Sequence, residues 1–341
     1  MVKVLHVVES FASGVASAVI EYVANSPQCD HYLLYAGRKD APLDTTKLDL
    51  FAGAEAMAKG HIARAVQLRR MQRALNIDIV HGHSTYGGVY ARSARFDKRT
   101  KILYTPHCFA FERTDIPALA RAAILIVEKA LSIRTTTVAG CSRREVELAQ
   151  RLRRGMAAFY LPSVVPDYNV QSGPESSALS LVGAGRMSFQ KDIPFFLEIV
   201  QQFRDSGSAA TFTWIGGGTE QEEAALIDAG VEVTGWLNGS QVLDRLSAST
   251  VYLHTARWEG FPLGVLDAIA AGVPSVIRRT PSTSQFPEEA LESDVHGFVQ
   301  RITELTDPIA RQELGNSLQA FTVENSRRGQ SEALRKLYAV A

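Results

Sequence analysis

The stretch Ala256-Arg-Trp-Glu-Gly-Phe-Pro-Leu-Gly-Val-Leu-Asp-Ala-Ile-Ala-Ala-Gly-Val-Pro-Ser-Val-Ile277 carries the most information about the fold of this chain. It places a carboxylate, Glu259, on a tight Gly-Phe-Pro loop and then predicts a helix that carries a second carboxylate, Asp267. We expect the helix to stop at Gly272, and the apolar run Ser275–Ile277 to form a buried parallel strand. Such a loop exposes backbone N–H groups at a helix N-terminus, where phosphate or sugar oxygens bind well.

Glu259 and Asp267 are separated by about two helical turns, so both carboxylates can face one crevice. Carboxylates are suited to accepting hydrogen bonds from sugar and ribose hydroxyls. The order Glu-Gly-Phe-Pro-Leu, an acidic helix position and then Ala-x-Ala-x-Gly-x-Pro resembles the Glu-x7-Glu region of family 4 glycosyltransferases. The chain departs from that pattern at the second Glu, which is Asp267 here.

Length and composition set the broad class. A chain of 341 residues that is 46% hydrophobic is long enough for two globular domains. It has no apolar run of membrane-spanning length and no basic-then-apolar leader, and its three cysteines lack metal-ligand spacing. We therefore expect a cytoplasmic protein without a zinc site.

Charge is distributed unevenly along a chain whose net charge is zero. Up to Ser172 there are 23 Lys and Arg against 15 Asp and Glu, so the first half is basic and the second half acidic. This asymmetry favours an anionic partner for the first half. The densest basic stretch, Lys59–Arg73, has two interpretations: a solvated helix face beside a core stripe, or contact with a membrane surface or a phosphorylated acceptor.

Strand-like and helix-like segments alternate along the chain, which predicts βα units and mostly parallel sheets. A linker rich in Pro, Ser, Gly and Asn is expected at 162–178, between two doubly wound domains. The predicted strands are Val4–Val8, His31–Tyr35, Ile77–His81, Ile102–Thr105 and Thr136–Ala139, then Leu179–Gly183, Thr211–Ile215, Val231–Thr234, Val251–His254 and Pro274–Ile277. The predicted helices include Gly14–Ala24, Ile62–Leu75 and Gln330–Val340.

The second domain opens with Leu-Ser-Leu-Val-Gly-Ala-Gly-Arg-Met-Ser-Phe-Gln-Lys, in which Gly185 permits close backbone approach at a strand end. Arg186 and Lys191 then project two cations into the same crevice, where they can neutralise a diphosphate leaving group. This segment resembles the Gly-Arg-x-x-x-x-Lys segment of the same family. The resemblance implies that Arg186 and Lys191 hold the donor diphosphate.

Two further segments of the second domain border the expected nucleotide site. Gly216 and Gly217 follow an apolar strand and resemble the family's Gly-x-Gly loop near the nucleotide; the alternative is a strand-to-helix turn that needs a positive φ. Trp236, in Val-Thr-Gly-Trp, resembles the segment that borders the nucleotide base in related enzymes. Its alternative is packing in the core.

Histidines stand at two strand ends of the first domain. His81 and His83 have no carboxylate or cysteine at ligand spacing, so we expect no metal there. His107 occupies the place at which the resembled family has a histidine that lies beside the donor sugar and supports catalysis. The alternative is a buried histidine with satisfied hydrogen bonds. Relatives have a Gly-Gly pair after the first strand, whereas this chain offers Gly14 followed by Val15.

A helix N-terminus is predicted where the sequence Gly-Cys-Ser-Arg-Arg-Glu ends a strand. Ser142 is expected as its N-cap, with Glu145 completing a capping box.

The resemblance implies a GT-B fold, with two Rossmann-like domains facing across a cleft and a final helix that packs back on the first domain. The expected ranges are 1–165 for the acceptor-side domain, 166–328 for the donor domain and 329–341 for the returning helix. The implied partners are a nucleoside diphosphate sugar and a glycan or lipid-linked acceptor, with peripheral membrane contact through the basic first half and no nucleic acid. No metal or other cofactor is expected, because cations and helix N-termini can replace one at the diphosphate.

The implied reaction is sugar transfer with retention of configuration, in bacterial cell-surface polysaccharide or lipopolysaccharide synthesis. Glu259 is expected to hold sugar hydroxyls, Asp267 the ribose, and His107 the region of the donor sugar. Further donor contacts are expected from the backbone at Gly14, Gly185, Gly216, Gly217, Gly260, Phe261, Pro262 and Leu263, among which Pro262 has no N–H to donate. Two alternatives remain: a non-catalytic nucleotide-sugar-binding subunit of the same fold, and another enzyme class such as an epimerase or phosphorylase.

Overall fold

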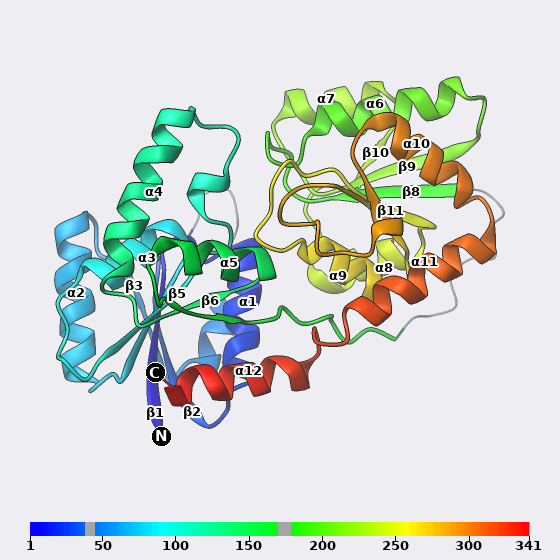
Figure 1. Cartoon of the computed structure of the whole chain (residues 1–341). Coiled ribbons are helices and arrows are strands. Elements are labelled where there is room, and N and C mark those ends of the chain that lie inside the picture. Colours follow the sequence, from blue (N-terminus) through cyan, green and yellow to red (C-terminus); the bar gives the residue numbers. More distant parts are fainter. Residues whose placement is uncertain (38–44, 170–178, 341) are drawn as a thin grey trace. The chain divides into compact units, whose positions relative to one another are not determined.

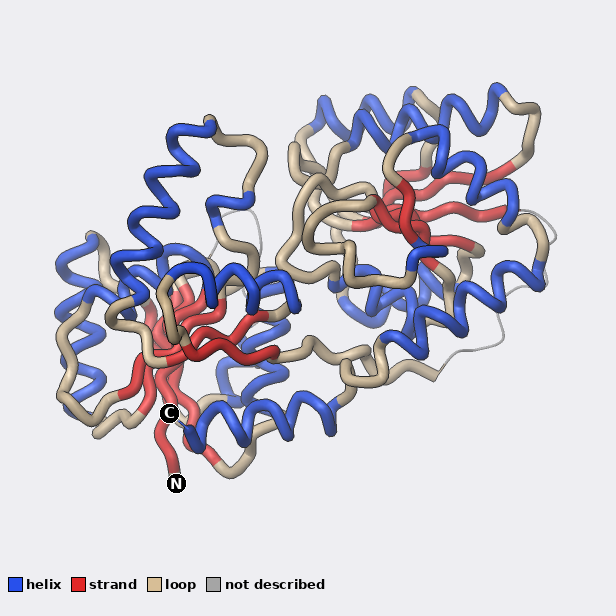
Figure 2. The backbone as a smooth tube through the Cα atoms, in the orientation of Figure 1, coloured by secondary structure: helices blue, strands red, loops and turns tan. Residues whose placement is uncertain are grey.

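The computed structural model describes residues 1–37, 45–169 and 179–340. The chain divides into two compact units, one formed by Met1–Val164 with Asn325–Ala341 and the other by Val165–Glu324. Each unit is built on one parallel β-sheet with helices packed on its faces (Figures 1 and 2). The linker expected at 162–178 contains neither helix nor strand over 162–169, and its remainder lies outside the described residues.

The first unit has a seven-stranded sheet in the order β3-β2-β1-β4-β5-β6-β7, in which every neighbouring pair is parallel. Its strands are β1 (Val2–Val8), β2 (Cys29–Tyr35), β3 (Gly53–Ala56), β4 (Ile79–His83), β5 (Lys101–Thr105), β6 (Thr137–Gly140) and β7 (Ala157–Tyr160). Its helices are α1 (Ser13–Ala24), α2 (His61–Ala74), α3 (Ser84–Ser93), α4 (Ala118–Ser132), α5 (Arg143–Leu152) and α12 (Arg327–Val340), with short 3-10 turns η1 (Thr45–Leu50) and η2 (Ala110–Glu112).

The second unit has a six-stranded sheet in the order β10-β9-β8-β11-β12-β13, again parallel throughout. Its strands are β8 (Leu179–Ala184), β9 (Ala210–Ile215), β10 (Glu232–Val233), β11 (Val251–His254), β12 (Ser275–Arg278) and β13 (Leu291–Glu292). Its helices are α6 (Ile193–Asp205), α7 (Glu220–Asp228), α8 (Gly239–Ser247), α9 (Leu263–Ala270), α10 (Val295–Glu304) and α11 (Pro308–Phe321), with the turn η3 (Glu288–Ala290).

The opening stretch folds as its sequence predicts. The helix α9 ends at Ala270, and Gly272 takes a left-handed φ of 74° that turns the chain toward β12. β12 is buried and pairs in parallel with β11. The strand expected at Ile77–His81 lies two residues later, as β4 at Ile79–His83. Backbone hydrogen bonds keep Ile77 in the turn after α2.

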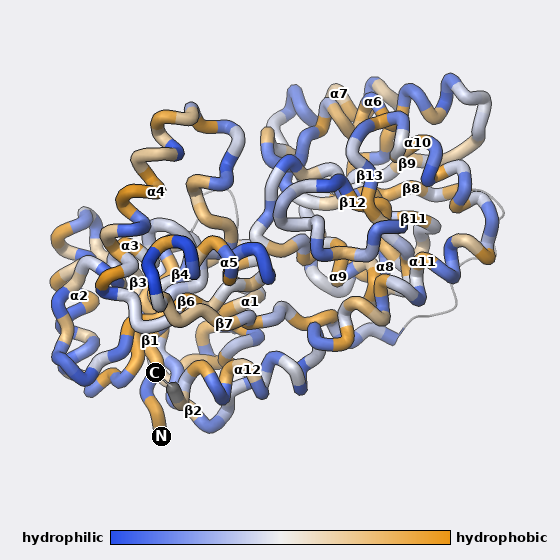
Figure 3. Tube along the Cα trace, in the orientation of Figure 1, coloured by the Kyte–Doolittle hydropathy of each residue, from blue (hydrophilic) through white to orange (hydrophobic). Residues whose placement is uncertain are grey.

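Hydrophobic residues are frequent on the strands of both sheets, as Figure 3 shows. The C-terminal helix α12 belongs to the core of the first unit, although the chain reaches it last. Leu334, Leu337 and Tyr338 pack there against Val4 of β1 and Ile79 of β4. Leu334, Leu337 and Tyr338 thus form the buried apolar face by which α12 joins the first unit.

Candidate functional site

The strand order of the second unit reverses between β8 and β11, because the chain moves outward from β8 to β9 and later returns on the other side of β8 to form β11. At such a switch point the loops that leave the carboxyl ends of two neighbouring strands diverge, and ligands bind between them. The loop after β8 contains Gly185, Arg186 and Lys191, and the loop after β11 contains Glu259 through Pro262. The fold therefore brings the two principal sequence motifs to one place.

Direct contacts join these two loops. The Lys191 ammonium forms an ion pair with the Glu259 carboxylate, with 2.5 Å between Nζ and Oε1. The amide of Gln190 donates to the other oxygen of Glu259 at 3.2 Å and to the carbonyl of Trp258 at 2.9 Å. The side chains of Lys191 and Glu259 remain 22% and 14% exposed, so a ligand can reach both charges. Arg186 is exposed on the same loop.

A buried acid supports the turn that presents Lys191. Asp192 takes a left-handed φ of 55°, and its carboxylate accepts hydrogen bonds from Arg257 at 2.8 Å and Arg278 at 2.6 Å. The hydroxyl of Thr255 donates to the Lys191 carbonyl at 2.7 Å. Sequence analysis missed these supporting residues, because their contacts join segments far apart in the chain.

Two glycines allow the backbones after β8 and β9 to approach closely. Gly185 and Gly216 have φ values of 130° and 132°, and a Cβ on Gly216 would lie 2.3 Å from the Gly185 carbonyl oxygen. That carbonyl also accepts a hydrogen bond from the indole N–H of Trp214 at 2.9 Å. Gly216 is thus required by the turn itself, as the structural alternative for this loop proposes. A role of these glycines in donor binding stays a prediction.

Trp236 lies beside the same loop, since a Cβ on Gly217 would stand 2.9 Å from its indole nitrogen. Its side chain is 56% exposed. The alternative of core packing for Trp236 is therefore wrong, and a flat aromatic surface is available next to Gly217.

The loop after β11 continues into α9, whose first residue is Leu263 after Gly260, Phe261 and Pro262. The first N–H groups of an α-helix have no acceptor within the helix, so this end can bind anionic or sugar oxygens. Asp267 lies one turn further along α9, and burial raises the pKa of its carboxyl to about 6. The pKa of the buried Tyr252 hydroxyl is raised by burial and then by the charges of Asp267 and Glu259.

In the first unit, His107 follows β5 in a strained turn. His107 and the next residue, Cys108, have left-handed φ values of 49° and 86°, which residues other than glycine rarely adopt. The buried Glu145 carboxylate holds this turn, because it accepts the Cys108 N–H at 2.5 Å and the Cys141 N–H at 2.8 Å. Burial raises the pKa of Glu145, while these two hydrogen bonds lower it.

The helix start at Ser142 differs in one respect from the sequence prediction. Ser142 does cap α5, accepting the N–H of Glu145 at 3.2 Å. The expected capping box is wrong in its second half, because the Glu145 carboxylate is engaged by Cys141 and Cys108 rather than by the N–H of Ser142. Glu145 thereby ties the end of β6 to the turn that carries His107. Gly14 lies in the exposed first turn of α1.

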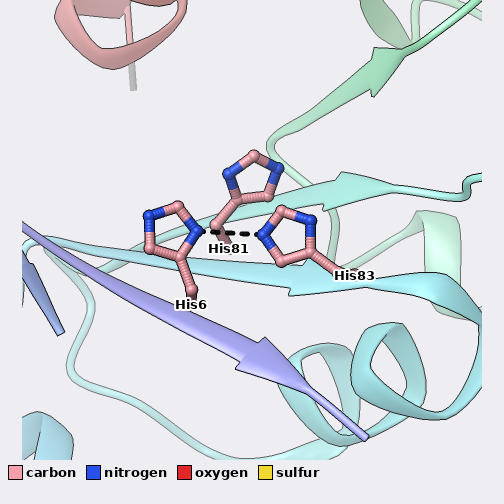
Figure 4. Close-up of side chains that lie close together, drawn as sticks. All are labelled: His6, His81 and His83. Carbon is pink, nitrogen blue, oxygen red and sulfur yellow. Dashed lines mark hydrogen bonds between the residues drawn. The ribbon is translucent and has the colours of Figure 1, made fainter. Parts of the chain in front are cut away.

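His107 is partly exposed and contacts other histidines on its inner side. Its Nε2 lies 3.2 Å from Nδ1 of the buried His83, and His83 in turn contacts His6. Figure 4 shows His6, His81 and His83 converging from two neighbouring strands, β1 and β4. One nitrogen of each of these three side chains lies within 4.8 Å of the others, a spacing at which a metal ion could be held. Sequence analysis considered His81 and His83 but missed His6, and the expectation of no metal stays a prediction.

Comparison with known proteins assigns both units to one class. The sequence model for the glycosyl transferase 4-like domain matches residues 4–158, and that for glycosyl transferases group 1 matches residues 178–310. The chain is a glycosyltransferase of the family 4 type. An undecaprenol-diphosphate galactosyltransferase from Escherichia coli, UDP-Gal:alpha-D-GlcNAc-diphosphoundecaprenol alpha-1,3-galactosyltransferase, is 23% identical over 71% of this glycosyltransferase and 70% of its own length.

Solved structures show that the fold of this glycosyltransferase is GT-B. Sucrose-phosphate synthase from Thermosynechococcus elongatus matches with a TM-score of 0.80 and 14% identity, over 99% of this chain and 98% of its own. Anabaena HepE, in complex with UDP and glucose, matches with a TM-score of 0.80 and 13% identity over the whole of both chains. Within the described ranges of this glycosyltransferase, no helix is both long and apolar enough to span a bilayer.

Proposed function

We propose that this glycosyltransferase moves a sugar from a nucleoside diphosphate sugar to a lipid-linked or glycan acceptor, with retention of configuration at the anomeric carbon. The observation that carries the donor half of this proposal is the Lys191–Glu259 pair, which sets a cation for phosphate beside a carboxylate for sugar hydroxyls at the switch point of the second sheet. The solved relative that holds UDP and glucose supports a uridine diphosphate donor.

In this proposal the two ends of the donor meet different groups. The three N–H bonds of the Lys191 ammonium allow it to bind a phosphate oxygen while it keeps Glu259 in place. Arg186 lies on the same loop and adds a second cation, so the charge of the diphosphate is offset without a metal. Asp267 accepts hydrogen bonds from the ribose, and Trp236 lies where it can border the base.

In this proposal the configuration of the anomeric carbon is retained, because the acceptor attacks the face of the sugar from which the diphosphate leaves. The bond between the anomeric carbon and the diphosphate oxygen breaks, and the acceptor oxygen forms its bond on the same side. The acceptor proton passes to the departing diphosphate oxygen, and the cations stabilise the charge that develops there. His107 and Gly14 are proposed as further contacts of the donor sugar. The backbone N–H groups at Gly216, Gly217 and the start of α9 are proposed to donate further hydrogen bonds to the nucleoside diphosphate sugar.

We also propose that the protein works at the cytoplasmic surface of a membrane, in the synthesis of a cell-surface polysaccharide. The name of the Escherichia coli relative gives a diphosphoundecaprenol acceptor, which is a membrane lipid. The basic character of the first half of the chain fits the anionic surface of a membrane.

The helix α4 supplies the apolar part of such a contact. Its residues Leu119 and Ile126 are 83% and 67% exposed, and Ile133 just beyond its end is 74% exposed. These positions recur at helical spacing along one side, and Figure 3 shows α4 as a largely hydrophobic helix. Its single acid, Glu128, is buried, whereas Lys129 is exposed. An apolar face with exposed positive charge is typical of helices that lie in a membrane interface.

Donor binding is tested by thermal unfolding of the purified protein with UDP-, GDP- and ADP-sugars. A ligand that binds only the folded protein raises the unfolding temperature, so the matching donor is expected to raise it in the wild type and not in Arg186→Ala. Release of free nucleoside diphosphate with a lipid diphosphate acceptor then measures turnover. Folded protein that responds to none of the donors contradicts the proposal.

Membrane contact is tested by sedimentation with vesicles of anionic or neutral phospholipid. We expect binding to anionic vesicles that weakens with salt and is lost in Ile126→Asp. Ile309→Asp is the matched control, because Ile309 is 65% exposed on the second unit. Equal binding by both variants would locate the contact elsewhere.

A further inference from the structure

The first unit holds six of the eight histidines of this protein, and five of them, all except His61, form a cluster. Four of these five are joined in one chain of hydrogen bonds. The distances are 3.0 Å from His31 Nδ1 to His6 Nε2, 3.0 Å from His6 Nδ1 to His83 Nε2, and 3.2 Å from His83 Nδ1 to His107 Nε2. Figure 4 shows the bond between His6 and His83. The chain leads from the interior of the unit to the partly exposed His107.

The parallel register of three strands builds this chain. His6 of β1 stands opposite His81 of β4, and His83 follows two residues later on the same face. His31 of β2 stands opposite Val4, which lies two residues before His6 and on the same face of the sheet. Aligned side chains on neighbouring strands come close enough for ring nitrogens to meet.

The inner end of the chain fixes the direction of every hydrogen bond. His31 Nε2 lies 3.1 Å from the carbonyl oxygen of Ser26 and 2.9 Å from its hydroxyl oxygen. The carbonyl can only accept, and the single hydrogen of the hydroxyl is donated to the carbonyl of Tyr22. His31 must therefore carry its hydrogen on Nε2.

Each ring in the chain is held in its neutral form. Burial lowers the pKa of His6, His31 and His83 below the ordinary value, and it lowers the pKa of His107 to about 4. A neutral imidazole has one N–H and one unprotonated nitrogen. A donor on one side of the ring thus requires an acceptor on the other.

We propose that the chain His31–His6–His83 acts as a positioning device that fixes the tautomer of His107. Because His31 donates from Nε2, its Nδ1 accepts from Nε2 of His6. The same alternation makes Nδ1 of His6 accept from His83, and Nδ1 of His83 accept from His107. His107 consequently carries its hydrogen on Nε2 and presents the lone pair of Nδ1.

This inference rests on the proposed function for its consequence, though not for its test. At the donor sugar, His107 accepts a hydrogen bond from a hydroxyl through Nδ1 and does not supply a proton. A ligand that offers a hydroxyl is favoured over one that offers only an acceptor, since the latter would leave two lone pairs facing one another. The ring orientation is fixed with the tautomer, because Nε2 is held by His83.

His81 lies outside this chain although its ring is the nearest to His83. Its Nε2 contacts the Thr105 hydroxyl at 2.8 Å, and its Nδ1 lies 3.4 Å from the Tyr338 hydroxyl. A metal ion on His6, His81 and His83 would need an unprotonated nitrogen from each ring. The hydrogen bond between His6 and His83 places a hydrogen between two of those nitrogens. The chain of histidine hydrogen bonds and a metal ion bound to these three rings therefore cannot exist at the same time.

The tautomer is measured by NMR on ligand-free protein labelled with 15N at histidine, in which long-range couplings distinguish the two nitrogens of each ring. His107 is assigned by the loss of its signals in His107→Asn. We expect an unprotonated Nδ1 and a protonated Nε2 at neutral pH. The reverse tautomer, or a mixture, in the wild type overturns the proposal without any need for a variant.

Two substitutions at His31, three rings away from His107, test transmission along the chain. His31→Phe removes the acceptor of His6, so the His107 signals are expected to shift toward a mixture of tautomers. His31→Gln offers a side-chain oxygen to His6 and is expected to keep the wild-type signals. His61→Gln is the control, because His61 contacts Tyr90 and is not part of the cluster.

An unchanged His107 tautomer in folded His31→Phe overturns the proposal. So does one equivalent of transition metal in the purified protein that disappears in His6→Phe. Neither outcome depends on donor binding, so failure of this inference is distinguishable from failure of the proposed function.

Discussion

The carboxyl group of Asp267 resists ionisation, because burial raises its pKa from 3.8 to about 6. Between pH 3.8 and about 6, this carboxyl group binds more protons in the folded protein than in the unfolded protein. Asp267 therefore lowers the stability of the ligand-free protein as pH rises from about 4 through 6. The carboxylate that we propose as the acceptor of ribose hydroxyls forms over the same pH range.

We predict that donor affinity rises with pH through a midpoint near 6 and that Asp267→Asn removes this dependence. The same variant is expected to raise the unfolding temperature of ligand-free protein at pH 8 and to leave it unchanged near pH 4. Titration of donor binding and thermal unfolding at a series of pH values check the two halves. Asp267→Glu should keep or raise donor affinity, whereas Asp267→Ala should weaken it. Unchanged affinity in the alanine variant would remove Asp267 from the site.

A second prediction concerns Lys191, whose ammonium contacts Glu259. Lys191→Met keeps the length of the side chain and removes the charge, so the donor diphosphate loses a charge-assisted hydrogen bond. Such bonds contribute about 1.5–3 kcal/mol, which corresponds to a Kd weaker by roughly 10- to 150-fold. Calorimetric titration with the donor measures the loss. Lys98→Met, on the exposed surface of the first unit, serves as the control.

At the scale of elements, one buried ion pair joins α3 to α4. Arg92 and Glu128 are both buried, and their contacts measure 2.6 Å and 3.1 Å. The guanidinium also donates to the Gly88 carbonyl at 2.9 Å and lies 3.7 Å from the centre of the Tyr104 ring. α4 is thereby fastened through its inner side, while its outer side remains apolar and exposed.

We predict that Glu128→Ala costs about 3–5 kcal/mol of unfolding free energy, because it leaves the Arg92 charge buried without its partner. Urea unfolding measures this, with Glu147→Ala on the exposed side of α5 as the control, expected within about 0.5 kcal/mol of wild type. The double variant Arg92→Met with Glu128→Leu is expected to recover most of the loss. A single-variant cost no larger than the control's would show that the pair contributes little.

Local patterns were sufficient to predict most elements of this chain. The apolar run of β12 and the left-handed turn at Gly272 depend on neighbouring residues, and both lie where the sequence places them. β3, β7 and β13 escaped prediction, because each has at most four residues and none is fully buried. Short strands at a sheet edge are specified by their partner strand rather than by their own pattern.

In the candidate site, too, the residues were predictable from local motifs, whereas the contacts between them were not. Lys191 and Glu259 were predicted from their motifs, but their ion pair depends on β8 and β11 being neighbours in the sheet. The chain of histidines depends on register, because a shift of one residue between β1 and β4 would turn His6 away from His83. No local signal carries register, so a cluster assembled from three strands was not predictable.

For the whole molecule, the returning helix α12 is the decisive element. Leu334 is fully buried in the core of the first unit. We predict that Leu334→Ala costs about 2–5 kcal/mol, the range for a truncated core leucine. Lys336→Ala on the exposed side of the same helix is expected to cost less than about 0.5 kcal/mol. Unfolding followed by tryptophan fluorescence reports mainly on the second unit, which holds all three tryptophans, so circular dichroism should accompany it.

Polar contacts also join α12 to the rest of the first unit. The Gln330 side chain accepts from the Asn25 amide at 2.7 Å and donates to the Pro162 carbonyl at 2.8 Å, and all three lie in the first unit. The first unit is thus completed by residues that follow the entire second unit in the sequence.

This arrangement sets an order of assembly during protein synthesis. When residue 164 leaves the ribosome, the nascent first unit still lacks the side chains of α12 that close its core beside β1 and β4. The second unit is continuous in sequence, so it can fold as soon as Glu324 has emerged. Domains of most chains fold in order from the N-terminus. Here a helix that is translated after the entire second unit completes the unit that was translated before it, and apolar surface on the first unit stays accessible to chaperones until α12 has emerged.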